Sequence, residues 1–370
     1  MKTAIIHYWL VNMRGGEKML EALLELYPDA DIYTHVYAPK AVSGLINSHR
    51  VYTSYINKLP LAKKLYQKYM PLMPNALKDF NLQDYDLVIS SEAGPAKGVV
   101  PNPNAYHLCY CHSPMRYLWD MYHEYFRKSS FPVRFFMKRL IPGLRVWDIS
   151  SANMVDRFVT NSRYVAKRVL RTYNREAEVV FGPASIEKFL DLERKPQDYY
   201  LFFGQAVGYK RADIAIEACI RSGRRLVVAG AGMDKRDIRK YEKSGLVDFR
   251  GRVSDDEVKA LLSGARALLF PGIEDFGLVP IEANAAGCPV IAFRRGGALD
   301  SVKENVTGVF FDEQSPASLI AALESFEKRE KDFSAITDSG REKYRRHVEQ
   351  FSKEAFKDRI KNIVGERKRI

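Results

Sequence analysis

FPGIEDFGLVPIEANAAGCPVIAFRRGG, residues 270–297, holds two carboxylates, Glu274 and Glu282, on either side of a glycine that is expected to open a helix. Phe276-Gly277-Leu278 has the composition of a bend. Pro280 suits the first turn of a helix, where its missing N–H is not needed. The helix is expected to end at the Gly-Cys-Pro sequence that follows. Because a helix N-terminus carries unpaired N–H groups and the positive end of the helix dipole, the stretch predicts a site for an anion such as a diphosphate.

Apolar runs flank this helix on both sides. Residues 265–271 (ARALLFP) and 289–293 (PVIAF) indicate buried parallel strands. This order would place Glu274 in a loop and Glu282 in the first helical turn, at the carboxyl end of a sheet, where open α/β folds bind ligands. Each carboxylate also has a structural explanation, as a solvated loop residue or as a partner of the helix dipole.

The pattern E-x-FG-x-x-x-x-E-A-x-A-x-G-x-PV-x-A, followed by GG and then by Thr307-Gly308, resembles the retaining, nucleotide-sugar-dependent glycosyltransferases of family 4. These enzymes have the GT-B fold, so the resemblance implies an α/β chain of two Rossmann-like domains whose parallel sheets face each other across a cleft. It further implies that Glu282 binds the ribose of the donor and Glu274 the hydroxyls of the transferred sugar. Backbone N–H groups of Phe276, Gly277 and Leu278 would contact that sugar and the diphosphate.

The chain has 370 residues, which is too long for one ordinary core and predicts two domains. We expect an N-terminal Rossmann-like acceptor domain over residues 1–190 and a C-terminal Rossmann-like domain for the nucleotide-sugar donor over residues 191–345. In GT-B enzymes the final helix crosses back to the first domain, so the resemblance implies the same for residues 346–370.

The composition is that of a soluble globular protein, with 46% hydrophobic and 28% charged residues. The four cysteines lie in apolar runs and suit buried thiols in a reducing cytoplasm, which is the expected location. No apolar run approaches the ~18 residues of a membrane span, and no cysteine or histidine spacing indicates a metal site. The net charge of +13 predicts an anionic partner, but no RNA-recognition or helix-turn-helix signature favours nucleic acid.

Two stretches of the N-terminal half mix basic and aromatic residues, at 50–80 and at 116–146. Basic and aromatic residues interleaved at helical spacing are typical of a helix that lies on an anionic bilayer. Each stretch alone fits an ordinary core stripe with a solvated lysine face equally well. Two of them in one domain favour peripheral contact with an anionic membrane, at the inner face of the cytoplasmic membrane.

A glycine pair, Gly15-Gly16, lies between a predicted first strand at residues 2–11 and a predicted helix at 17–26. Glycine there lets the backbone approach a phosphate or an acceptor hydroxyl, although a tight turn between a strand and a helix needs the same residues. The resemblance implies a Gly-Gly-x-Glu loop against the donor diphosphate and the acceptor. This chain departs from that loop because Glu17 directly follows the pair.

His112 follows a predicted strand at residues 105–111, again at the carboxyl end of a sheet. A histidine there can carry charge near neutral pH beside a diphosphate or a sugar, although a lone histidine is commonly structural. CHSPMRYLWD, residues 111–120, resembles a subgroup of family 4, the mannosyltransferases of bacterial O-antigen and other surface-polysaccharide assembly. The resemblance implies that His112 lines the active site, with Arg116 as a weaker candidate for an acceptor contact.

The predicted second domain opens with a strand at residues 199–204 and a basic turn. Lys210 and Arg211, at the start of the next helix, would neutralise two phosphates, unless they form only a solvated turn. The resemblance implies an Arg and a Lys that grip the donor diphosphate, and Lys210 matches the Lys. Gln205 stands where the Arg is expected and brings no charge, so Arg211 or another arginine would have to replace it.

Two turns of this domain are candidates for the nucleobase. Gly230 ends one predicted strand, and Arg252 and Val253 follow another; the resemblance implies that both turns flank the base. The acidic run at residues 254–257 is better explained as the capping box of a helix than as a metal site. Because no Asp-x-Asp motif lies in a metal-site context, we expect a metal-independent transfer that needs no cofactor.

These features together predict a retaining glycosyltransferase. It would move a hexose, with mannose from GDP-mannose as the first choice, onto a saccharide acceptor linked to a lipid diphosphate, with Glu274, His112 and Lys210 as catalytic residues. The first alternative is a family 4 enzyme that uses a UDP-sugar and another acceptor. An alternative of another class is a basic nucleic-acid-binding protein or a non-catalytic protein on the same fold.

Overall fold

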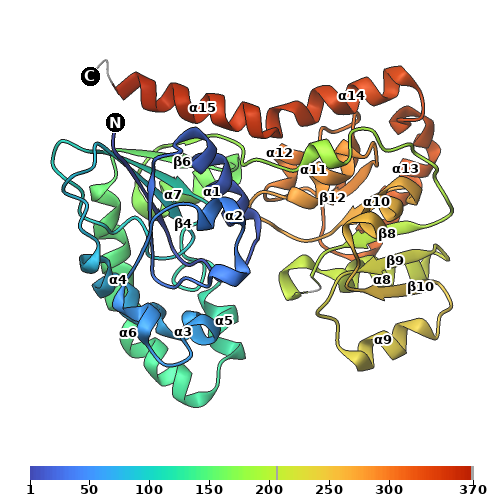
Figure 1. Ribbon diagram of the computed structural model, residues 1–370. Coiled ribbons are helices and arrows are strands. Elements are labelled where there is room, and N and C mark those ends of the chain that lie inside the picture. The colour runs from blue at the N-terminus through green and yellow to red at the C-terminus, as the bar shows by residue number, and fades with distance from the viewer. Residues whose placement is uncertain (206, 368–370) are drawn as a thin grey trace. The chain divides into compact units, whose positions relative to one another are not determined.

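The structure, a computed structural model, describes residues 1–205 and 207–367 (Figure 1). The chain divides into two compact units. Unit 1 comprises Met1–Pro183 together with Phe356–Ile370, and unit 2 comprises Ala184–Ala355. Unit 1 is therefore assembled from both ends of the chain.

Unit 1 is built on a seven-stranded parallel sheet with the order β3-β2-β1-β4-β5-β6-β7. The strands are β1 (Thr3–His7), β2 (Asp31–Thr34), β3 (Val51–Thr53), β4 (Leu87–Glu92), β5 (Tyr106–Cys111), β6 (Arg157–Thr160) and β7 (Ala177–Val179). The central strands are buried on both faces, as parallel strands covered by helices are. The order places β1 between β2 and β4, so the polar residues that end β1, β4 and β5 share one edge.

Alternation of side chains along these strands divides the unit 1 core between two faces. Ile5, Ile89 and Leu108 pack with α1 and α15 on one face, whereas Val88 and Cys109 belong to separate clusters. The helices of unit 1 are α1 (Gly15–Leu26), α2 (Gly44–Asn47), α3 (Ala62–Leu65), α4 (Met73–Ala76), α5 (Tyr122–Lys128), α6 (Phe131–Ser151), α7 (Arg163–Tyr173) and most of α15 (Lys353–Glu366).

The last helix, α15, drawn in red in Figure 1, supplies unit 1 with part of its core. Phe356, Ile360 and Ile363 recur at helical spacing and are all buried among residues of α1 and the central strands. Two ion pairs tie its surface to the same unit, from Lys357 to Glu25 at 3.1 Å and from Arg359 to Glu178 at 2.7 Å. The end of the chain is therefore an integral element of the first unit.

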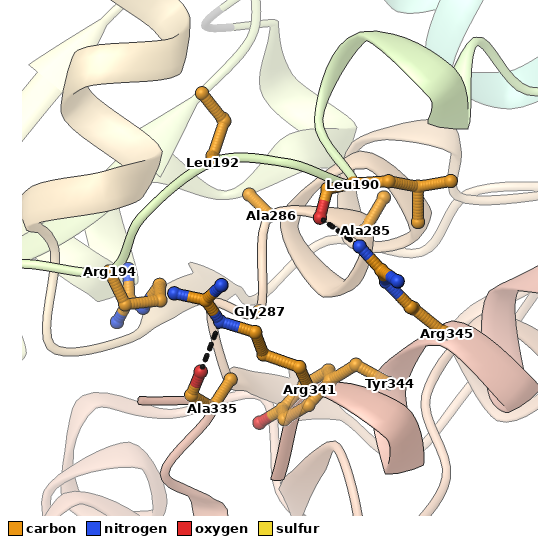
Figure 2. Close-up of a pocket in the computed structure, with 10 residues that line it drawn as sticks. All are labelled: Leu190, Leu192, Arg194, Ala285, Ala286, Gly287, Ala335, Arg341, Tyr344 and Arg345. Atoms are coloured by element: carbon orange, nitrogen blue, oxygen red, sulfur yellow. Dashed lines mark hydrogen bonds between the residues drawn. The ribbon is translucent and has the colours of Figure 1, made fainter. Parts of the chain in front are cut away.

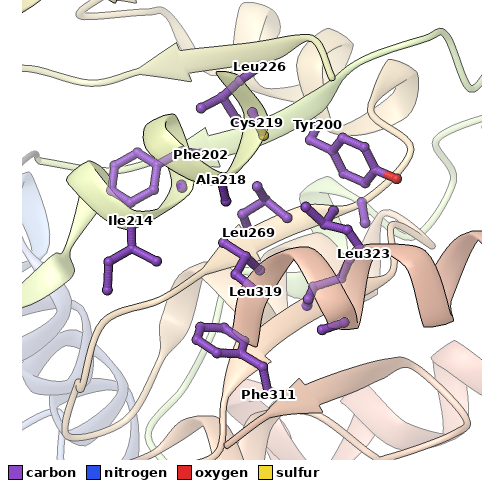
Figure 3. Packing of buried hydrophobic residues seen from close by; sticks show 14 of the residues in the cluster. Tyr200, Phe202, Ile214, Ala218, Cys219, Leu226, Leu269, Phe311, Leu319 and Leu323 are labelled. Carbon is purple, nitrogen blue, oxygen red and sulfur yellow. The ribbon is translucent and has the colours of Figure 1, made fainter. Parts of the chain in front are cut away.

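Unit 2 is built on a six-stranded parallel sheet with the order β10-β9-β8-β11-β12-β13. Its core lies where α8 and α13 cover the strands; Figure 3 shows Ile214 and Cys219 from α8 and Leu319 and Leu323 from α13 beside the strand side chains. The strands are β8 (Tyr200–Phe203), β9 (Leu226–Ala229), β10 (Val247–Gly251), β11 (Leu268–Phe270), β12 (Val290–Phe293) and β13 (Gly308–Phe311). The helices are α8 (Ala212–Arg221), α9 (Lys235–Glu242), α10 (Asp255–Gly264), α11 (Leu278–Ala285), α12 (Ala298–Ser301), α13 (Pro316–Lys328) and α14 (Asp338–Val348).

The predicted strands and helices next to the two glycine turns are present, with shifted ends. Helix α11 begins at Leu278 rather than at Pro280, so Glu282 lies in the second turn and the prediction of the first turn is wrong. Helix α1 begins at Gly15 rather than at Glu17, so the glycine pair forms its first turn. Both helices extend because the first four N–H groups of a helix need no partner within it, which admits glycine or proline there. The capping box of α10 is confirmed, since the Ser254 and Glu257 side chains each bind the other's backbone.

The two basic and aromatic stretches fold differently. Residues 50–80, whose spacing suggested a helix on a bilayer or a core stripe, form β3, several 3-10 turns and two four-residue helices. Ile56 and Met73 from this stretch are fully buried in a small core, against which Tyr66 and Tyr69 pack. The second stretch contains α6, a continuous helix of 21 residues whose outer side remains exposed.

A charged cluster lies at the centre of unit 1. Lys97, Glu92 and Asp148 are each fully buried, and Lys97 Nζ pairs with both carboxylates. Burial alone would lower the pKa of Lys97, but the two carboxylates outweigh it and raise the pKa above its usual value. Asp148 also accepts hydrogen bonds from Trp119 Nε1 at 2.7 Å and from Tyr173 Oη at 3.1 Å. The cluster thus anchors the C-terminal end of α6 to the sheet.

We predict that Asp148→Asn lowers the free energy of unfolding of unit 1 by about 3–5 kcal/mol, the usual cost of breaking one side of a buried ion pair. Asp84→Asn is the matched control, because Asp84 forms an exposed pair with Lys2 at 3.8 Å, and such pairs contribute at most about 1 kcal/mol. Urea denaturation followed by tryptophan fluorescence measures this unit alone, because all three tryptophans of the chain lie in it. Equal losses for the two variants would contradict the assignment.

Candidate functional site

The order of the unit 2 sheet creates a switch point between β8 and β11. From β8 the chain moves outward to β9 and β10, and it then returns to the other side of β8 to form β11, β12 and β13. In open α/β sheets the loops at the carboxyl ends of such a strand pair diverge and leave room for a ligand. The loops after β8 and β11 carry Lys210 and Glu274 respectively.

Glycine at the carboxyl ends of β8 and β9 brings their backbones into close contact. Gly204 and Gly230 have φ angles of +133° and +128°, which disfavour any other residue. A Cβ atom on Gly230 would collide with the carbonyl of Gly204, and the Gly230 N–H donates to Gly251 O at 2.6 Å. The edge predicted for the nucleobase is therefore lined by backbone at Gly204 and Gly230.

Lys210 and Glu274 form an ion pair at the switch point. Lys210 Nζ lies 2.9 Å from Glu274 Oε1, and the two side chains are only 15% and 18% exposed. The ammonium also lies over the end of β8, since a Cβ on Gly204 would be 3.1 Å from Nζ. Gly272 keeps the two loops close, because a Cβ there would be 2.7 Å from Lys210 Cα. The structure thus brings together two residues that lie 64 positions apart in the sequence.

The Gly296-Gly297 pair holds the loop that carries Glu274. The Gly297 N–H donates to Glu274 O at 2.7 Å, and Gly296 has a φ angle of +74°. A Cβ on Gly296 would be 2.5 Å from the same carbonyl oxygen. Phe276 is buried, and Gly277, with a φ angle of +85°, is the N-cap of α11. The position of the Glu274 carboxylate therefore depends on backbone contacts that only glycine permits.

Glu282 lies on α11 with a partly exposed side chain, and a basic group that the sequence did not single out lies near it. Lys188 Nζ donates to Asp255 Oδ2 at 2.8 Å, and this bond raises the pKa of Lys188, to which the charge of Glu282 adds. Lys188 lies outside every motif described above. Only the fold brings Lys188 near α11.

The remaining predicted donor residues surround the switch point without converging on one side chain. Arg211 adopts the left-handed conformation, with a φ angle of +53°, and its guanidinium binds Asp213 at 2.8 Å and Gln314 at 3.3 Å. Gln205 and Arg252 are exposed in the loops after β8 and β10, and Val253 is half-buried beside Arg252. Leu278 is half-buried at the first position of α11.

A small cavity of about 10 Å³ lies behind α11, away from Glu274 (Figure 2). Its basic side chains bind backbone carbonyls: Arg341 Nε donates to Ala335 O at 3.3 Å, and Arg345 donates to Leu190 O at 3.4 Å. Buried Arg194 likewise binds the carbonyls of Ser263 and Ala265. These arginines therefore link neighbouring loops through hydrogen bonds to backbone carbonyls. The cavity has room for about one water molecule.

The predicted residues of unit 1 gather at the carboxyl ends of β1, β4 and β5. Gly16 lies against Tyr8, since a Cβ would be 2.7 Å from Tyr8 Oη. Half-buried His112 follows β5, and its Nε2 lies 3.0 Å from Ser91 Oγ at the end of β4. Arg116 lies in the loop after His112 and contacts Met121 Sδ at 3.8 Å.

Sequence reasoning missed the polar residues behind His112. Buried His7 bonds to Ser91 through Nδ1 at 2.9 Å, and its Nε2 faces Glu17 Oε1 at 3.7 Å. The relevant signals were the polar ends of the predicted strands and the carboxylate that directly follows the glycine pair. Only the strand order shows that these signals belong to one group.

Comparison with known proteins is consistent with this geometry. Residues 185–343, nearly all of unit 2, match the model of the family described as glycosyl transferases group 1. The chain is 28% identical to the human α-1,3/1,6-mannosyltransferase ALG2, a match covering 70% of this chain and 67% of that protein. It is also 28% identical to the D-inositol 3-phosphate glycosyltransferase of Acidothermus cellulolyticus, covering 49% and 48%. The chain thus spans about half to two thirds of these curated relatives.

Solved structures show the same fold over the whole chain. HepE from Anabaena, solved in complex with UDP, has a TM-score of 0.71 at 16% identity, with 99% of this chain and 100% of that chain covered. The sucrose-phosphate synthase of Thermosynechococcus elongatus has the same TM-score and identity, with 99% of each chain covered. The predicted GT-B fold is therefore confirmed, and residues 185–343 are similar to the glycosyl transferases of group 1.

We predict that Gly296→Ala disturbs the Glu274 loop, whereas Gly223→Ala does not. The two glycines have φ angles of +74° and +70°, so alanine costs each about 1–2 kcal/mol of backbone strain. Gly223 has no atom within 4 Å of the added Cβ, whereas Gly296 meets Glu274 O, which adds about 1–3 kcal/mol. Hydrogen exchange should quicken at the amide of Gly297 only in Gly296→Ala. Equal exchange in both variants would contradict the proposed role of the pair.

Proposed function

We propose that the chain is a retaining glycosyltransferase of family 4 that transfers a hexose, mannose from GDP-mannose, to a saccharide linked to a lipid diphosphate. The observation that carries this proposal is the Lys210–Glu274 ion pair of 2.9 Å at the switch point of the unit 2 sheet. The Lys210 ammonium can bind a phosphate, and the Glu274 carboxylate can accept hydrogen bonds from sugar hydroxyls. Both lie beside glycine backbone at the carboxyl end of the sheet. The choice of mannose rests on the CHSPMRYLWD sequence and on the mannosyltransferase among the relatives.

In the proposed reaction the bond between the anomeric carbon and the diphosphate breaks through an oxocarbenium-like state. Negative charge then develops on the departing diphosphate. Lys210 can serve both groups, because an ammonium has three donors and the Glu274 carboxylate engages only one side of it. The N-terminus of α11 behind Gly277 adds backbone N–H groups and the positive end of its dipole.

The nucleotide is proposed to bind across the glycine edge of β8, β9 and β10, with Glu282 accepting hydrogen bonds from the ribose. Gln205 carries no charge, so Arg211 would supply the second positive charge at the diphosphate. Its guanidinium, which binds Asp213 in this structure, would bind a phosphate oxygen instead. Positive charge at the diphosphate then comes from side chains, so we propose a transfer that uses neither metal nor cofactor. In the acceptor site, Gly15, Gly16 and His112 would contact the incoming saccharide.

A UDP-sugar is the second candidate donor, because structures of HepE include complexes with UDP and with UDP-glucose. In the described structure the edge at Gly230 is formed by the backbone of Gly204 and Gly251, which favours neither guanine nor uracil. The two donors share the diphosphate and the ribose, and hence the proposed roles of Lys210 and Glu282.

A thermal-shift panel of GDP, UDP, ADP and their hexose conjugates tests the proposal. We expect GDP-mannose to raise the melting temperature, because a ligand at 100 times its Kd stabilises the fold by about 2.7 kcal/mol. Glu282→Ala should abolish this shift, whereas Glu324→Ala, which removes an exposed carboxylate from α13, should retain it. A shift with the UDP series alone would select the second donor. No shift with any nucleotide, or an unchanged shift in Glu282→Ala, would overturn the proposed donor site.

The partner proposed for unit 1 is an anionic lipid bilayer, bound through the outer side of α6. No helix among the described residues has the length and apolarity to cross a bilayer. On α6, however, large apolar side chains stand exposed, with Phe131 at 83%, Phe135 at 63% and Phe136 at 60%. Its inner side packs Met137 and Ile141 into a small core. Phosphate headgroups fit this surface because every charged residue on α6 before buried Asp148 is basic.

Charge reversal on α6 is predicted to weaken this binding. Because each cation near an anionic surface contributes about 1 kcal/mol, Lys138→Glu combined with Arg139→Glu should lower binding to phosphatidylglycerol vesicles at least about tenfold. Ile336→Ser, which removes an exposed apolar residue of unit 2, is the control. Flotation measures the bound fraction, and an equal bound fraction for the double variant and wild type would exclude α6 as the membrane surface.

A further inference from the structure

A line of four polar side chains runs through unit 1 to His112. Glu17 Oε1 lies 3.7 Å from His7 Nε2, His7 Nδ1 lies 2.9 Å from Ser91 Oγ, and Ser91 Oγ lies 3.0 Å from His112 Nε2. Glu17, His7 and Ser91 are at most 1% exposed, whereas His112 is half-buried. The line therefore connects buried Glu17, in the first turn of α1, with the candidate site.

The strand order creates this alignment. His7 ends β1 and is the register partner of Ser91 on β4, and His112 directly follows β5, the next strand of the sheet. Glu17 reaches the line because its Oε2 accepts the N–H of Arg14 at 2.9 Å, which turns Oε1 towards His7. The carboxylate that departs from the expected Gly-Gly-x-Glu spacing is thus held in place by the helix start.

Other charged and aromatic groups surround the line without entering it. The Tyr8 ring stacks on His7 at a centroid distance of 4.3 Å, and Tyr110 meets His112 edge-on at 5.1 Å. The Glu92 carboxylate binds Lys97 and the backbone N–H of Ala96. The hydrogen bonds at Ser91 therefore join the two histidines alone in the described structure.

The donors and acceptors of the line determine one another. Burial raises the pKa of Glu17, but its contacts with His7 and with backbone N–H groups outweigh burial and lower the pKa, so Glu17 is a carboxylate at neutral pH. A negative oxygen favours an N–H at the facing Nε2 of His7, although 3.7 Å is longer than a hydrogen bond. When His7 carries a single proton, on Nε2, its Nδ1 is an acceptor. The single hydroxyl hydrogen of Ser91 goes to His7, so Ser91 Oγ must accept from Nε2–H of His112.

We propose that Glu17, His7 and Ser91 are positioning residues that fix the proton of neutral His112 on Nε2, so that its Nδ1 carries the lone pair. The proposal deepens the proposed function, because it takes His112 to contact the ligand. An imidazole whose Nδ1 carries a lone pair accepts a hydrogen bond from a hydroxyl and offers none to a phosphate oxygen. His112 is therefore assigned to a saccharide hydroxyl rather than to the diphosphate.

Glu17→Gln tests the line at its far end. The Arg14 N–H requires the amide oxygen of the new side chain at the Oε2 position, which places the NH₂ group opposite His7 Nε2. Every donor and acceptor along the line should then reverse, and neutral His112 should carry its proton on Nδ1. Nitrogen NMR of protein labelled with ¹⁵N-histidine reports this directly, at a pH about two units above the usual histidine pKa of ~6.5.

Two serines make the test specific. Ser91→Ala interrupts the line, so Glu17→Gln should no longer affect His112 in that background. Ser90 is the matched control: it is equally buried, and it bonds to His107 at 2.9 Å outside the line. In the Ser90→Ala background, Glu17→Gln should still move the proton of His112. An unchanged His112 signal in Glu17→Gln overturns the proposal. If that variant does not fold, an unchanged Nε2 signal in Ser91→Ala does so.

Turnover separates this inference from the proposed function. We expect Glu17→Gln to lower kcat on the order of 10- to 100-fold, the usual effect of misplacing a group through its hydrogen-bond partner, with little change in the KM of the nucleotide sugar. Ser90→Ala should retain wild-type kcat. If the proton of His112 moves and the protein transfers no sugar from any donor, the line stands and the proposed function fails. If transfer is normal and the proton does not move, the line fails and the proposed function stands.

Discussion

Close approach of backbone to backbone at the carboxyl edge of the unit 2 sheet is the constraint on which the candidate site depends. Gly230 fits against the carbonyl of Gly204, Gly272 against Lys210, and Gly296 against the carbonyl of Glu274. Each contact excludes a side chain, so the loops after β8, β9, β11 and β12 pack at a spacing that no other residue allows. These close backbone contacts hold the loops that carry Lys210 and Glu274 together, and the two side chains form an ion pair of 2.9 Å.

Much of unit 2 could be predicted because local sequence determines it. Residues 265–293 carry a short apolar run, a bend, a helix and a second apolar run, and each signal acts within a few residues. The exact start of α11 could not be predicted, because Gly277, Leu278 and Pro280 are all compatible with the first turn of a helix. The pairing of Lys210 with Glu274 also required the strand order, which no short segment contains.

In unit 1 several features could not be predicted from local sequence. Its central strands are apolar enough to be recognised, yet Lys97, Glu92 and Asp148 are buried among them, and composition would place these residues at the surface. The interleaved residues 50–80 were misleading for the opposite reason: their aromatic side chains fill a core between short turns. Residues at helical spacing share one face only if the chain is helical throughout. Pro60, Pro71 and Pro74 disfavour a continuous helix over residues 50–80. His7 and Ser91 are visible in the sequence as polar residues at strand ends, but their contact could not be predicted, since it exists only across neighbouring strands.

The use of α15 in the core of unit 1 has a consequence for how the protein is made. A ribosome releases residues 1–183 long before Phe356, Ile360 and Ile363, and until those side chains arrive, the face of the sheet beside α1 lacks part of its apolar cover. Unit 2 lies on one continuous segment and has no such delay. The order of synthesis is thus reversed in the order of completion: synthesis reaches unit 1 before unit 2, but the core of unit 1 is completed after unit 2.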